Sequence, residues 1–105
     1  MKYRSPRSPP KNFKVTFLEE PPLNNLQKNY LVNLVPKIGR ACSAPEEIQL
    51  ELSTELCKYL QKSVGVSVVE KPANFNPQDY ENHLKPITFR MTMNEHLYRI
   101  WIHED

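Results

Sequence analysis

Apolar and polar residues alternate strictly in two short runs near the end of the chain. The apolar positions of these runs are Ile87, Phe89, Met91, Met93, Tyr98, Ile100 and Ile102. A period of two is typical of β-strands that bury one face. A two-residue turn at Asn94 and Glu95 would join the runs as a hairpin and place Met91 opposite Tyr98. A four-residue loop remains the alternative, because Asn-Glu is weaker turn chemistry than Asn-Gly.

Two longer segments have the three- and four-residue apolar spacing of amphipathic helices. The apolar residues of the first, residues 23–35, are Leu23, Leu26, Tyr30, Leu31 and Leu34. This helix is expected to stop before Pro36, with Gly39 in the turn that follows. The second covers residues 46–63, and its stripe is Ile48, Leu52, Leu56, Leu60 and Val64. Ser43 and Glu46 predict a capping box at its start, and Gly65 is expected to close it.

Three shorter segments complete the pattern. Residues 12–18 alternate Phe13, Val15 and Phe17 with polar side chains, and residues 66–69 form a short β-branched run. Asn76-Pro77 predicts one or two helical turns from there to residue 84. The order predicts an α+β fold, in which a mostly antiparallel sheet of about four strands has helices packed on one face and ends in a C-terminal β-hairpin. A chain of 105 residues suits one domain, which we expect at residues 12–105.

The charge is divided between the start of the chain and the remainder. Residues 1–18 contain five lysines and arginines and no acidic residue, so the rest of this +2 chain carries a net −3. Residues 1–11 are expected to be a disordered, basic arm, because Ser5 and Ser8 each precede a proline that opposes helix formation. Arg4, Arg7 and Lys11 are candidate contacts to RNA, DNA or an acidic protein. Ser5 and Ser8 are candidate phosphorylation sites; the alternative is a merely solvated tail.

The polar face of the hairpin carries the main candidate binding site. The two-residue turn places Arg90 opposite Arg99 and Thr88 opposite Trp101. Two facing arginines repel unless an anion lies between them, and tryptophan is enriched at binding hot spots. The candidate partner-binding residues on this face are Arg90, Arg99, Trp101, Lys14, Thr88 and His103. The alternative is that Trp101 packs beneath a loop while the arginines extend into water.

Several function classes fit the sequence poorly. With two glycines there is no phosphate-binding loop, and His83, His96 and His103 are scattered without a nucleophile beside them. Cys42 and Cys57 lack the spacing of a zinc site, and their number fits the reducing nucleus or cytoplasm. No apolar run approaches the roughly 20 residues of a membrane span. We therefore expect no catalysis, cofactor, metal, membrane contact or small-molecule substrate.

The sequence favours a non-catalytic adaptor subunit of an intracellular complex. In this hypothesis an anionic or acidic protein partner docks on the basic, tryptophan-containing sheet face and on the arm. The alternative is an RNA-binding module that uses the same residues, because single-stranded RNA readers combine aromatic stacking with cations on an open sheet.

Overall fold

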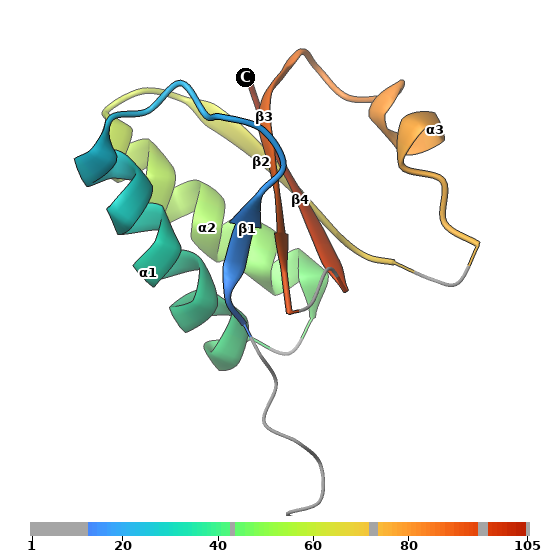
Figure 1. Ribbon diagram of the computed structural model, residues 1–105, viewed down its shortest axis with the longest axis horizontal. Helices are drawn as coiled ribbons and strands as arrows, with labels where there is room; N and C mark the ends of the chain where they lie inside the picture. The colour runs from blue at the N-terminus through green and yellow to red at the C-terminus, as the bar shows by residue number, and fades with distance from the viewer. Residues whose placement is uncertain (1–12, 43, 72–73, 95–96, 105) are drawn as a thin grey trace, which may run out of the picture.

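The computed structural model describes residues 13–42, 44–71, 74–94 and 97–104. Its elements are β1 (Val15–Phe17), α1 (Asn25–Ala41), α2 (Pro45–Leu60), β2 (Val64–Glu70), α3 (Pro77–Glu81), β3 (Ile87–Met93) and β4 (Tyr98–Glu104). The strands form one antiparallel sheet in the order β1-β3-β4-β2. Helices α1 and α2 cover one face, and the short α3 lies on the other side (Figure 1). The predicted α+β fold and C-terminal hairpin are confirmed, and the expected arm lies outside the described residues.

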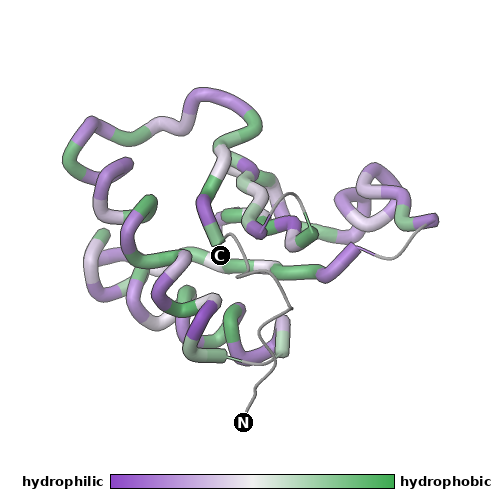
Figure 2. The backbone as a smooth tube through the Cα atoms, turned by 60° about the horizontal axis from the view of Figure 1, so that its bottom comes forward, coloured by the Kyte–Doolittle hydropathy of each residue, from purple (hydrophilic) through white to green (hydrophobic). Residues whose placement is uncertain are grey.

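The main core lies between the sheet and the pair α1 and α2. Apolar side chains from alternate strand positions meet the buried stripes of both helices. Figure 2 shows hydrophobic and hydrophilic residues alternating along the helices and strands that enclose this layer. The most deeply buried members are Leu31, Val35, Ile48, Leu52, Leu56, Met91, Met93 and Ile100. Burial of such side chains stabilises a fold by about 1.5–3 kcal/mol each, so this layer supplies most of the driving force.

Helix α1 continues through Pro36 to Ala41, so the expected stop before Pro36 is wrong. Its start is fixed by a reciprocal cap, in which Asn24 Oδ1 accepts from the Gln27 backbone N–H at 2.8 Å. The helix is retained beyond Pro36 because Ile38 is buried in the core. Gly39 lies inside the helix, where an added Cβ would come within 3.0 Å of Met93 and Phe13 side-chain atoms. Gly39 therefore permits close packing of α1 on β3 and does not form a turn.

Helix α2 begins and ends differently from the prediction. Its N-cap is Ala44, whose backbone N–H donates to Glu47 Oε1 at 3.1 Å, and Pro45 is the first helical residue. The expected Ser43–Glu46 box is thus displaced by one residue, and Ser43 itself lies outside the described residues. The helix ends at Leu60, followed by Gln61 in the left-handed conformation at φ 57°. Gly65 is part of β2 and does not close the helix.

The hairpin has the longer loop, so the predicted register is wrong by two residues. Met93 lies opposite Tyr98 and Met91 opposite Ile100, which leaves residues 94–97 as the connection. Because side chains alternate with a period of two, this shift keeps Phe89, Met91 and Met93 on the predicted face. Ile87 is the exception, because it pairs with His103 and not with Ile102. It changes the cross-strand neighbours: Arg90 lies opposite Trp101 and not opposite Arg99. An irregularity between Ile87 and Phe89 leaves Thr88 without the partner that was expected.

Candidate functional site

Trp101 is completely buried beneath α3, so the expected open platform is wrong for this structure. Its exposed fraction is 0%, and its ring centroid lies 4.8 Å from that of Tyr80 and 6.3 Å from that of Phe75. The indole Nε1–H donates to Glu81 Oε2 at 2.5 Å. Trp101 therefore belongs to a second, smaller aromatic cluster on the outer face of the sheet, as in the alternative that places it under a loop.

Arg90 is held by carboxylates of the chain itself. Its Nε donates to Glu19 Oε2 at 3.0 Å and its Nη2 to Glu19 Oε1 at 2.7 Å, which is the two-pronged geometry of a strong arginine–carboxylate pair. The Arg90 backbone N–H also donates to Glu19 Oε2, at 2.7 Å. On its other side, Arg90 Nη1 lies 3.4 Å from Glu81 Oε1. Glu19 and Glu81 thus fix Arg90 as part of the structure.

Glu81 supplies the anion that two neighbouring arginines require. Its carboxylate lies 3.4 Å from Arg90 Nη1 and 3.9 Å from Arg99 Nη2. The Arg99 guanidinium also lies 5.7 Å from the centroid of the Trp101 ring, within range of a cation–π interaction. Arg99 Nε is buried and has no hydrogen-bond partner among the described residues. Of the two arginines, Arg99 is therefore the one whose Nε–H donor remains unsatisfied by the described residues.

The hydrogen bonds to Arg90 hold the pKa of the Glu19 carboxyl below its ordinary value of 4.5, although desolvation acts in the opposite direction. Ionised Glu19 therefore stabilises the folded state above pH 4.5, and this stabilisation is lost as the pH falls through the lowered pKa. We expect Glu19→Gln to reduce the free energy of unfolding at pH 7 by about 1–3 kcal/mol. The difference from wild type should shrink below pH 4.5, as measured by urea unfolding across pH.

Glu20→Gln is the matched control for this experiment. Glu20 is 78% exposed and pairs with Lys28 at the surface, so its loss should change stability by about 0.5 kcal/mol or less. A Glu19→Gln effect that stays constant from neutral to acid pH would show that the carboxylate charge is not what stabilises this face.

The remaining predicted site residues are separated by the fold. Val15 lies opposite Met93, so Lys14 is at the far end of β3 from Thr88. His103 lies near Thr88 at the rim of a cleft, and its Nε2 is 3.1 Å from Ser67 Oγ. The structure thus brings Arg90, Arg99 and Trp101 together and leaves the other three elsewhere. The candidate arm residues Arg4, Ser5, Arg7, Ser8 and Lys11 lie outside the described residues.

Ser67 and His103 have the separation of a nucleophile and its base but not the surroundings. Ser67 is 7% exposed, in the middle of β2. His103 Nδ1 is buried, and the described residues provide no hydrogen-bond partner that would orient the ring. Added bulk at Gly65 would collide with this ring, which accounts for a glycine at that strand position. We interpret the pair as a cross-strand contact that aligns β2 with β4.

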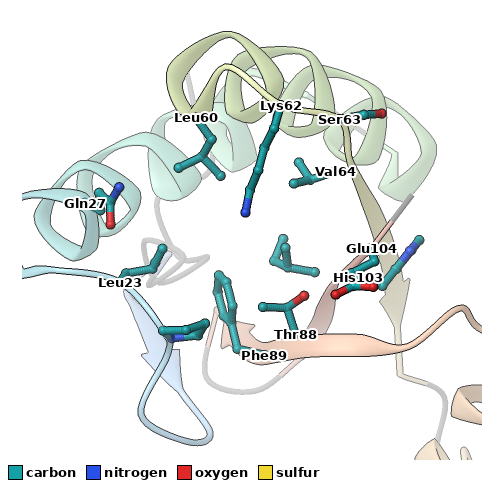
Figure 3. A pocket seen from close by; sticks show the side chains of 12 residues that line it. Leu23, Gln27, Leu60, Lys62, Ser63, Val64, Thr88, Phe89, His103 and Glu104 are labelled. Atoms are coloured by element: carbon teal, nitrogen blue, oxygen red, sulfur yellow. The ribbon is translucent and has the colours of Figure 1, made fainter.

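A cleft of about 440 Å³ opens at one end of the sheet, where sequence reasoning placed no site (Figure 3). Its apolar lining is contributed by Pro22, Leu23, Leu60, Val64, Phe89 and Ile102. Its polar lining is contributed by Gln27, Lys62, Ser63, Thr88, His103 and Glu104. A narrower apolar crevice continues from it toward Leu31 and Leu56 in the core. The cleft therefore combines an apolar floor with a polar rim.

The cleft exists because β1 is short. β1 pairs only with residues 91–93, and the Leu18 N–H donates to the Arg90 carbonyl at 3.0 Å. The chain then turns through Pro21 and Pro22 toward α1, so β1 provides no neighbour for the first residues of β3. This unpaired edge, together with the ends of α1 and α2, leaves the space open.

Lys62 is the most prominent charge at the cleft. It follows the C-terminal end of α2, and Figure 3 shows its side chain extending across the opening. It is exposed, and none of the described residues forms an ion pair with it. Glu104 lines the same cleft on the side of β4. Lys62 and Glu104 thus contribute charges of opposite sign to the lining of the cleft.

Comparisons with known proteins identify no relative of this chain by sequence. No protein-family model matches the chain, and no curated protein matches it in sequence. No helix in the described part of the chain is both long and apolar enough to span a membrane. The described residues also contain no group of three or more His, Cys, Asp or Glu that could hold a metal ion.

Proposed function

We propose that this chain is a non-catalytic interaction module of an intracellular complex, and that it docks an acidic segment of a protein partner. The observation that carries the proposal is the end cleft, with Leu23, Leu60 and Phe89 in its apolar lining and the exposed ammonium of Lys62 above it. The partner segment would insert one apolar side chain and place a carboxylate beside Lys62. The covered sheet face is not needed for this contact.

The size and chemistry of the cleft support a peptide side chain as the occupant. Its volume of about 440 Å³ lies within the range of known ligand pockets, about 300–1,000 Å³. Burying one leucine or phenylalanine there would contribute about 1.5–3 kcal/mol. The ion pair with Lys62 would add about 1 kcal/mol or less, because both charges remain close to water. Glu104, which lines the same cleft, would repel a carboxylate placed beside it and so favour a segment whose acidic residue lies next to Lys62.

The charge distribution and the cysteines agree with this proposal. The five bases within residues 1–18 would attract an acidic partner over long range and raise the association rate. Cys42 and Cys57 are both free thiols, as expected of a protein in the nucleus or cytoplasm. RNA binding loses support in comparison, because Trp101, the only tryptophan, is covered and cannot stack on a base. RNA is therefore kept as an outcome of the test.

A random peptide library displayed on phage, selected against the full chain, tests the proposal. We expect the enriched peptides to combine a large apolar residue with neighbouring Asp or Glu. Lys62→Glu should weaken the best peptide by about fivefold, as reversing one exposed charge contact costs about 1 kcal/mol. Binding would be followed by fluorescence anisotropy of the labelled peptide.

Lys58→Glu is the matched control, since Lys58 is also an exposed lysine near the end of α2 but is paired with Glu55 at 3.4 Å. It does not line the cleft, and its variant should bind the peptide as the wild type does. Equal losses from the two variants would overturn the proposed site. Enrichment without acidic residues, or tighter binding of oligouridine RNA than of any peptide, would overturn an acidic protein segment as the ligand.

A further inference from the structure

The two arginines on the outer sheet face are satisfied to different degrees. Arg90 donates two parallel hydrogen bonds to Glu19, from Nη2 at 2.7 Å and from Nε at 3.0 Å. Arg99 lies over the Trp101 ring and has a longer contact with Glu81, 3.9 Å from its Nη2, while its Nε is buried without a partner among the described residues. A guanidinium binds a carboxylate best through two parallel N–H bonds. Arg99 is thus an incompletely occupied carboxylate receptor.

The cover over Arg99 is lightly anchored. Helix α3 has five residues, and none of them is buried. A helix of this length is not stable alone, so its position depends on side-chain contacts with the sheet. These contacts are the Tyr80 and Phe75 rings against Trp101 and the single carboxylate of Glu81. Figure 2 shows α3 mostly in the hydrophilic colour, away from the main core.

The Glu81 carboxylate faces three donor groups and makes a short hydrogen bond with only one of them. Its one short bond is to Trp101 Nε1, at 2.5 Å, while its distances to Arg90 and Arg99 are 3.4 Å and 3.9 Å. The position of Glu81 at the end of α3 keeps its carboxylate from accepting two parallel hydrogen bonds from Arg99. A carboxylate arriving from another molecule would not have this constraint and could bond both Nε and an Nη of Arg99.

We propose that α3 is a displaceable cover, and that an acidic segment of a protein partner binds Arg99 by replacing Glu81. Arg99 would then bind the incoming carboxylate, Arg90 would stay with Glu19, and Trp101 would become accessible beside the ligand. The site lies on the opposite face of the sheet from α1 and α2 and is independent of the end cleft. Failure of this proposal would therefore leave the proposed function of the end cleft unaffected, and the reverse also holds.

The internal carboxylate explains why this site is closed in the free chain. Glu81 is held next to Arg99 by the chain and therefore competes at a high effective concentration. The free chain should bind a short acidic peptide weakly. Neutralising Glu81 should remove the competitor and leave the Arg99 prongs intact.

Hexa-aspartate peptide and the fluorescence of Trp101, the only tryptophan, test this proposal in the full chain. In Glu81→Gln we expect the Trp101 emission to be red-shifted and more easily quenched by acrylamide. We also expect about tenfold tighter binding of hexa-aspartate, because the internal carboxylate no longer competes for Arg99. Adding Arg99→Lys to this variant should reverse the gain, because lysine lacks the two-pronged geometry.

Glu20→Gln is the control, because it removes one exposed carboxylate without touching this face. Hydrogen exchange of the wild type gives a second test that needs no variant: hexa-aspartate should accelerate exchange at the amides of α3 and not at those of β4. Unchanged peptide affinity in Glu81→Gln, or a gain that survives Arg99→Lys, would overturn the proposal. It would equally be overturned if hexauridine RNA bound Glu81→Gln more tightly than hexa-aspartate does.

Discussion

Replacing Trp101 with alanine should lower the free energy of unfolding by about 3–5 kcal/mol, as is typical of a large aromatic residue removed from a buried site. Trp101 is completely buried, and Tyr80 and Phe75 pack against it. Without the indole, these two rings lose their common partner and Glu81 loses its shortest hydrogen bond. Urea unfolding followed by far-UV circular dichroism measures the change, because the variant has no tryptophan fluorescence.

Trp101→Phe separates packing from the hydrogen bond. Phenylalanine retains most of the apolar contact and cannot donate to Glu81, so we expect an intermediate loss of about 1–3 kcal/mol. Leu97→Ala is an exposed control in the connection before β4, where the leucine is 36% exposed. A Trp101→Ala loss no larger than that of Leu97→Ala would contradict the burial of the indole beneath α3.

Leu52→Ala is expected to cost about 2–5 kcal/mol, the range for a leucine truncated in a packed core. Leu52 has no exposed surface and lies at the centre of the α2 stripe that faces the sheet. Leu50→Ala is a closely matched control, since Leu50 lies in the same helix with 68% of its surface exposed. Its effect should remain within about 0.5 kcal/mol of zero. Thermal and urea unfolding of both variants give the comparison, and similar losses would contradict the assigned face of α2.

The faces of the strands could be predicted from the sequence, whereas the hairpin register could not. Met91, Ile100 and Phe89 alternate with polar residues, and this pattern alone determines which side chains meet the helices. A shift of two residues preserves the pattern, so alternation cannot distinguish the two loops. Only the turn chemistry at Asn94 carried that information, and Asn94 adopts φ 57° in the four-residue connection.

The end of α1 was mispredicted because a local rule was overridden by packing. Proline opposes helix continuation, but Ile38 lies beyond Pro36 and is buried against the sheet. Gly39 resembles a turn residue in the sequence, and its actual role depends on the approach of Met93 and Phe13. Neither neighbour is close to it in sequence, so the contact could not be read from local spacing.

The chemistry of the outer face was anticipated only in part. An anion between two arginines was required by charge alone, and Glu81 supplies it from a helix whose start at Asn76 was predicted. The position of α3 on that face was not encoded in any periodicity. Glu19 is 71 residues from Arg90 in the chain, and its place beside a strand end gave no sign of the pair. The end cleft was missed because it arises from the shortness of β1.

Mapping the bound peptide onto the chain tests directly whether an acidic protein segment docks in the end cleft. The measurement is the change in backbone amide ¹H–¹⁵N NMR shifts of the full chain on titration with the most enriched peptide. We expect the largest shifts on residues lining the cleft, including Lys62, Val64, Phe89 and His103. Shifts confined to the segments before Phe13 or around Leu50, with the cleft unchanged, would contradict it.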